Sequence, residues 1–197
     1  PESEMKEILM LKDRLSMLES QDKCRDSFME YVRYIWDGFI EGEHHRLIAD
    51  KLTEVAQGKC KRLIVNMPPR HTKSEFASVY FPSWIMGLKP DMKIMQTTHT
   101  ADLSIRFGRK VRNLMDTQEY KRMFDNVSLA ADSKSAGRWE TSQGGEYFAA
   151  GVGGAITGRG ADLLIIDDPH SEQDALSLTA MEGAYEWYTS GPRQRLQ

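Results

Sequence analysis

Two pairs of adjacent residues have side chains suited to magnesium–nucleotide chemistry. One pair is Lys73 and Ser74, and the other is Asp167 and Asp168. A lysine can bind the terminal phosphates of a nucleoside triphosphate. A serine hydroxyl and an aspartate can hold Mg²⁺, and a further acid can position or deprotonate water. Each pair alone is weak evidence, but together, about ninety residues apart, they predict an ATP and Mg²⁺ site with Ser74 and Asp167 as metal ligands.

Each pair follows a predicted strand. The apolar run 62–66 precedes the loop that leads to Lys73, and the apolar run 162–166 ends at Asp167. Parallel strands of a doubly wound sheet bring their carboxyl ends to one edge, where ligands bind. We therefore predict an α/β fold of the P-loop NTPase (RecA-like) type, with a mainly parallel sheet flanked by helices and both pairs at one edge.

The loop before Lys73 departs from the usual phosphate-binding pattern. In G-x-x-x-x-G-K-[ST], glycine would stand at the positions of Met67 and Thr72. Strand, loop, Lys-Ser and helix nevertheless form the layout of a phosphate cradle, in which backbone N–H groups face the anion. The residues predicted to surround the phosphates are Pro69, Arg70, His71, Thr72, Lys73 and Ser74.

An aromatic residue and two histidines lie upstream of the loop. Phe39 could stack on an adenine ring, and His45 could form a hydrogen bond with it. Because neighbouring positions of a helix point to different faces, His44 and His45 are poorly placed to share a metal ion, which makes metal binding the weaker hypothesis. A role in helix capping or a plain surface position would also account for these histidines.

The remaining elements are predicted from hydrophobic periodicity and turn residues. We expect helices over residues 4–20, 27–36, 47–58, 74–84, 101–115 and 171–196, a strand over 93–98, and a hairpin with strands 138–141 and 146–150. Pro82 is expected to kink or end its helix. The basic face of helix 101–115 can contact a phosphate backbone or face solvent; its residues are Arg106, Arg109, Lys110 and Arg112.

The composition favours an ordinary globular protein. The 197 residues are predicted to form one domain over 39–197 with an N-terminal helical lead over 1–38. A net charge of −3 gives no general attraction to nucleic acid. Cys24 and Cys60 lack metal-ligand spacing, which favours a reducing, intracellular setting. Without a long apolar run or a signal-peptide pattern, we expect a cytoplasmic protein that does not contact membranes.

Three segments together resemble the ATPase domain of tailed-bacteriophage terminase large subunits, the motors that package viral DNA. They are Pro68-Pro69-Arg70-His71-Thr72-Lys73-Ser74, the Gly-x-Thr-Gly-Arg-Gly-Ala-Asp segment, and Leu-Ile-Ile-Asp-Asp-Pro. The similarity covers roughly residues 39–174. The first segment corresponds to the Walker A loop of that family, and the third to its Walker B strand.

The resemblance implies roles for individual residues. Lys73, Ser74 and Arg70 would contact the ATP phosphates, Asp167 would ligate magnesium, and Asp168 would occupy the catalytic-acid position. Phe39 and His45 fall near the adenine-contacting segment of the family. Arg159 would act as an arginine finger toward the ATP of a neighbouring subunit, or else form an ion pair with Asp162.

Two positions depart from the family pattern. The family often has glutamate where Asp168 stands, and a shorter acid withdraws the carboxylate by about one bond. Arg70 stands one place nearer the lysine than in some relatives. Family members also continue into a nuclease domain, so nuclease activity is not expected from these residues.

The resemblance also implies partners: double-stranded DNA, a portal protein, a small terminase subunit and further copies of the chain. The copies would form a pentameric ring when assembled and separate into monomers in isolation, in the host cytoplasm at the viral procapsid. Two different functions stay open. One is a helicase-like, nucleic-acid-dependent ATPase. The second is a non-hydrolysing nucleotide-binding assembly module, which the missing glycines favour and the joint presence of Lys73, Ser74 and Asp167 opposes.

Overall fold

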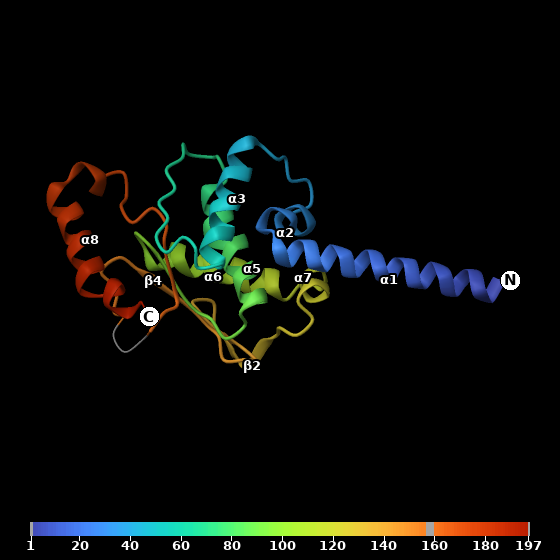
Figure 1. The fold of residues 1–197 in the computed structure, drawn as a ribbon. Helices are drawn as coiled ribbons and strands as arrows, with labels where there is room; N and C mark the ends of the chain where they lie inside the picture. Colours follow the sequence, from blue (N-terminus) through green and yellow to red (C-terminus); the bar gives the residue numbers. More distant parts are fainter. Residues whose placement is uncertain (1, 157–159, 197) are drawn as a thin grey trace.

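The computed structural model describes residues 2–156 and 160–196, in which helices pack on a five-stranded sheet (Figure 1). The helices are α1 (Glu2–Asp26), α2 (Phe28–Ile35), α3 (Glu43–Ala56), α4 (Lys73–Glu75), the π-helix η1 (Phe76–Tyr80), α5 (Phe81–Leu88), α6 (Ala101–Met115), α7 (Gln118–Met123), α8 (Leu178–Ser190) and the 3₁₀ turns η2 (Asp174–Leu176) and η3 (Pro192–Arg195). The strands are β1 (Lys93–Thr98), β2 (Leu129–Lys134), β3 (Arg138–Thr141), β4 (Glu146–Gly151) and β5 (Leu163–Ile166).

The sheet is mixed, in the order β2-β3-β4-β1-β5. β1 runs parallel to both β4 and β5, whereas β3 runs antiparallel to β2 and β4. The antiparallel half grows from the predicted hairpin, which is confirmed: Gly144 adopts a positive φ of 88° in the turn between β3 and β4. The prediction of a mainly parallel sheet of the P-loop NTPase type is therefore wrong, although the α/β class holds.

The predicted strand over residues 62–66 is also wrong. These residues have no regular secondary structure and belong to none of the five strands. Leu63 and Val65 pack against the core, whereas Ile64 between them is 86% exposed. The segment therefore has the alternating burial of a strand without a partner strand, and β5 forms the edge of the sheet.

The main core lies where α2 meets the helical stretch that contains α5. Phe28 is fully buried and packs edge-to-face against Phe76 and Phe81, with ring centroids 5.7 Å away in each case. Tyr31 is also fully buried, and its hydroxyl lies 2.7 Å from Ser83 Oγ. The aromatic stripe of the predicted helix 27–36 thus joins α2 to the core formed by later parts of the chain.

Helix α1 projects from this body as an arm (Figure 1). Its last turns hold it in place: the Gln21 amide bonds the Arg122 carbonyl, and Trp84 Nε1 donates to the Cys24 carbonyl over 2.6 Å. Residues 3–19 are exposed throughout. Within the described ranges, no helix is both long and apolar enough to cross a membrane.

Candidate functional site

Lys73 meets the acid pair at the carboxyl edge of β5. Its Nζ lies 2.5 Å from Asp168 Oδ1 and 3.7 Å from Asp167 Oδ1. Burial opposes the charge of this ammonium, but the hydrogen bond to Asp168 and the two carboxylate charges outweigh it and raise the pKa of Lys73. Lys73 of the first predicted pair therefore contacts both acids of the second, even though residues 62–66 lie outside the sheet.

Asp167 is held from behind by a buried hydrogen-bond relay. Gln96 Nε2 donates to Ser78 Oγ over 3.1 Å, and Ser78 Oγ donates to Asp167 Oδ2 over 2.9 Å. Ser78 and Gln96 are fully buried, and Asp167 is 6% exposed, whereas Asp168 is 61% exposed. One acid is thus fixed in orientation, with its second oxygen toward Lys73. Its neighbour Asp168 is bonded to Lys73 and is otherwise exposed to solvent.

Ser78 belongs to an irregular helical turn. The helical stretch from Lys73 to Leu88 contains the π-helix η1, which directly precedes α5. Pro82 lies in the first turn of α5, where a missing N–H is tolerated, so the helix continues through the proline instead of ending there. π-Helical turns are frequent at functional sites. Ser78 and Gln96 were not among the predicted site residues; the available signal was a glutamine within the buried strand β1.

Three residues other than glycine have positive φ in the described chain, and all lie at this site. They are Arg70 (65°), Thr72 (60°) and Asp168 (43°). Thr72 stands where the phosphate-loop pattern has glycine, and it adopts the left-handed conformation that glycine favours. Such conformations cost about 1–3 kcal/mol each and persist mainly at functional sites.

The amino end of the helix at Lys73 has no side-chain cap. Thr72 is its N-cap residue, and the first backbone bond runs from Phe76 N to Thr72 O over 3.0 Å. The leading N–H groups of a helix are left without intrahelical acceptors, and such an end favours a bound anion. Ser74 is the second residue of α4, and Arg70 and His71 lie exposed on the loop before it.

His45 connects α3 to this loop. Gly42 N donates to His45 Nδ1 over 2.8 Å, and His45 Nε2 lies 2.7 Å from Thr72 Oγ1. Because the Thr72 hydroxyl donates to the His71 carbonyl, Nε2 must carry the proton and donate to Thr72, which makes His45 neutral. Burial, followed by the charge of His44, lowers the pKa of His45.

The two predicted adenine contacts, Phe39 and His45, lie against each other. His45 is 5% exposed and stacks on Phe76, with centroids 5.0 Å apart, and the Phe39 ring approaches it at 4.9 Å. Both nitrogens of His45 are already bonded within the protein, so contact with a base stays a prediction for Phe39 and requires rearrangement for His45. Among the residues described, no three His, Cys, Asp or Glu side chains are arranged to hold a metal.

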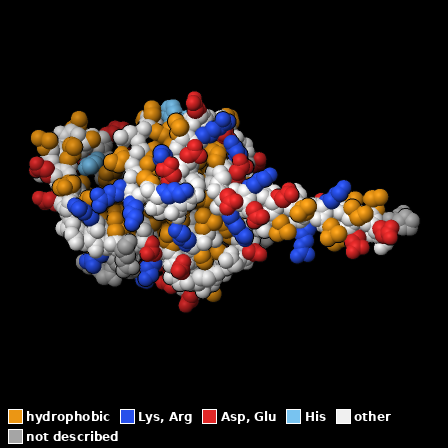
Figure 2. All heavy atoms as spheres, in the orientation of Figure 1, with side chains coloured by type: hydrophobic (Ala, Val, Ile, Leu, Met, Phe, Trp, Pro, Cys, Tyr) orange, Lys and Arg blue, Asp and Glu red, His pale blue; other side chains and the backbone are white. Residues whose placement is uncertain are grey.

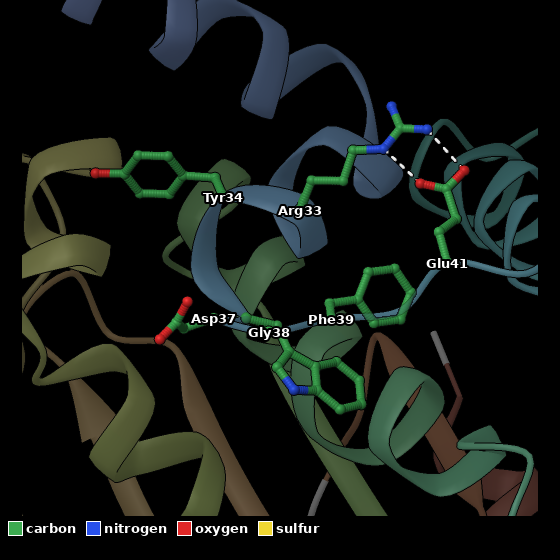
Figure 3. A pocket seen from close by; sticks show the side chains of 7 residues that line it. Arg33, Tyr34, Asp37, Gly38, Phe39 and Glu41 are labelled. Atoms are coloured by element: carbon green, nitrogen blue, oxygen red, sulfur yellow. Dashed lines mark hydrogen bonds and ion pairs between the residues drawn. The ribbon is translucent and has the colours of Figure 1, made fainter.

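Phe39 lines a pocket of about 330 Å³ between the end of α2 and the start of α3 (Figure 3). Arg33 and Glu41 face each other at this pocket and form two bonds, of 2.6 and 2.8 Å. The bonds from Arg33 and Arg46 lower the pKa of Glu41 to about 2. Trp36 forms a further wall, 5.0 Å from Phe39 between ring centroids.

The donor set at the acid pair suits magnesium. Mg²⁺ is usually held by one or two carboxylates together with waters and substrate phosphates, so it does not need three protein ligands. Asp167 offers a carboxylate that is fixed by Ser78, and Ser74 directly follows the lysine that contacts both acids. The predicted arginine finger, Arg159, lies outside the described residues. Over the face drawn in Figure 2, basic and acidic side chains are intermingled.

No protein-family model matches the chain, and comparison with curated proteins gives no match either.

Proposed function

We propose that this protein binds ATP with magnesium between the loop at Lys73 and the acids after β5, and hydrolyses it. The observation that carries the proposal is the approach of one ammonium to within 4 Å of two carboxylates that follow it by 94 and 95 residues. A strained loop, an uncapped helix end and a fixed carboxylate surround that contact. These are the parts that phosphoryl transfer requires.

Each residue then has a defined task. Lys73 leaves Asp168 and binds the terminal phosphates, assisted by the N–H groups of the helix end and by Arg70. Asp167 and Ser74 would hold Mg²⁺, which when bound neutralises charge on the phosphates. Asp168, released from Lys73 and exposed to solvent, orients or deprotonates the attacking water. Phe39 contacts the base from its pocket.

We further propose that hydrolysis drives double-stranded viral DNA into a procapsid, as in the terminase large subunits that the motifs resemble. The portal protein, the small terminase subunit and a ring of copies in the host cytoplasm belong to this proposal. Exposed Arg106 and Arg109 on α6 are compatible with a DNA-contacting surface. A helicase-like ATPase would use the same site, and stimulation by duplex rather than single-stranded DNA would separate the two.

The test is phosphate release from Mg-ATP by the wild-type chain, the Lys73→Ala variant and a matched lysine control. Lys51→Ala is suitable as the control because Lys51 also forms an ion pair, 2.8 Å from Glu54, but on an exposed face of α3. We expect Lys73→Ala to lose turnover and Lys51→Ala to keep it. Equal turnover in Lys73→Ala and wild type would refute the assignment, and ATP binding without turnover in the wild type would favour the non-hydrolysing module.

A further inference from the structure

Helix α1 exposes many apolar side chains along the part that projects from the body. Residues 3–19, about 25 Å of helix, are exposed, and only the last turns of α1 are anchored to the body. Five aliphatic side chains on this arm are between 48% and 60% exposed. Leu9 stands apart, and the other four recur at intervals of three and four residues: Ile8, Leu11, Leu15 and Leu18. A helix of this length is marginal without a packing partner.

The spacing of these four residues specifies the kind of partner. They recur at intervals of three and four, which places Ile8 and Leu15 at heptad position a and Leu11 and Leu18 at position d. The next a position is Asp22, so the apolar seam ends at Leu18. The helix contacts the body from Gln21 onward. A seam of this kind packs against another helix with the same repeat, and an identical helix is supplied by a second copy of the chain.

The flanking charges indicate a parallel pair. Positions g and e of successive heptads face each other in a parallel coiled coil. Here they pair Glu7 with Lys12 of the second copy and Arg14 with Glu19 of the second copy, so both contacts are attractive. An antiparallel pair that pairs Ile8 with Leu18 and Leu11 with Leu15 is symmetric about residue 13. It would bring Lys12 near Lys12 of the second copy and Arg14 near Arg14 of the second copy, and both contacts would be repulsive. Charge therefore favours the parallel arrangement.

From these observations we infer that residues 3–19 of α1 form a parallel two-stranded coiled coil with α1 of a second copy. Figure 2 shows the arm of a single copy, with apolar side chains on its surface. The inference does not depend on ATP binding, since the site around Lys73 is built from separate elements. Two heptads form a short seam, so the dimer is concentration-dependent.

The first test is sedimentation of the whole chain over a range of concentrations. Leu15→Glu, which places a charge in the seam, is compared with Leu9→Glu, which changes a residue of similar exposure at position b. We expect Leu15→Glu to weaken the dimer at least about a hundredfold, since each helix loses a buried leucine. Leu9→Glu should have little effect. Equal weakening by both variants, or a wild type that stays monomeric at every concentration, would overturn the inference.

The charges give a second test. Lys12→Glu sets two glutamates against each other and should weaken the dimer, and adding Glu7→Lys should restore it. Orientation is read from Leu11→Cys in a Cys60→Ser background, where the remaining Cys24 is buried. In a parallel pair, residue 11 of one copy lies beside residue 11 of the other, so two Leu11→Cys chains should form a disulfide between these positions. A disulfide that forms only when Leu11→Cys is mixed with Leu15→Cys would mean an antiparallel pair and refute the parallel one.

Discussion

Replacing Ser78 by alanine isolates the relay that fixes Asp167. Ser78 is fully buried in η1, accepts a bond from Gln96 and donates one to the Asp167 carboxylate. The substitution removes one small polar group and leaves almost no cavity. Its effect should therefore come from the two lost hydrogen bonds and from the carboxylate that is no longer held.

The expected cost follows from these two bonds. A hydrogen bond to a charged group is worth about 1.5–3 kcal/mol and one between neutral groups about 0.5–1.5 kcal/mol. We expect the free energy of unfolding to fall by about 3 kcal/mol, which for a chain of this size lowers the Tm by roughly 6–12 °C. The Mg-ATP affinity should fall as well, because the oxygen that faces the site loses its orientation.

The matched control is Ser104→Ala. Ser104 is also fully buried, but its hydroxyl bonds neutral groups: the Ala150 carbonyl at 2.6 Å and Thr98 Oγ1 at 3.0 Å. Denaturant unfolding of both variants, with and without Mg-ATP, gives stability and ligand affinity from one experiment. We expect Ser104→Ala to cost about 1–2 kcal/mol and to leave ligand stabilisation unchanged. If Ser78→Ala costs no more than Ser104→Ala, the carboxylate bond contributes nothing and the reasoning fails.

Two further predictions concern Asp168 and His45. Asp168→Asn should leave nucleotide binding largely intact and slow hydrolysis, measured as nucleotide affinity and phosphate release; loss of binding would instead make Asp168 a metal ligand. Lowering the pH should destabilise the fold through His45, because its pKa in the folded state lies below its ordinary value of 6.5 and the unfolded chain takes up the proton first. The contribution of neutral His45 to the free energy of unfolding is therefore fully present above pH 6.5 and is lost progressively as the pH falls below it. Glu41 partly offsets this effect, whereas His44 and His71 add to it. His45→Gln should flatten this part of the stability curve, and an unchanged curve would place the titration elsewhere.

Local signals predicted part of the elements correctly, whereas the predicted helix over 171–196 is reduced to α8 and two short 3₁₀ turns. Helix 101–115, strand 93–98 and the hairpin around Gly144 all occur, because periodicity and turn residues act over a few neighbours. Sheet direction is a long-range property, and it was predicted wrongly. The run 62–66 has the composition of a strand, but only its alternate side chains pack, and composition does not reveal whether a partner strand exists.

The convergence of Lys73 with the acids could be anticipated from residue types, whereas the relay behind Asp167 could not. Ser78 lies five residues after Lys73, which in a regular α-helix is about 140° around the axis. Helical periodicity would therefore not aim both side chains at one carboxylate. The π-helical turn changes the angle between the two side chains around the helix axis. No residue type within η1 predicts such a turn.

The ion pair between Lys73 and the acids makes the lysine an internal counter-ion. Its single positive charge already offsets one of the two negative charges that a free divalent cation would meet at these carboxylates. Dissolved Mg²⁺ must compete with a tethered charge at 2.5 Å, whereas Mg-ATP brings phosphates that attract the lysine away. Metal and nucleotide should therefore enter as one complex, because the tethered ammonium keeps metal alone from binding tightly.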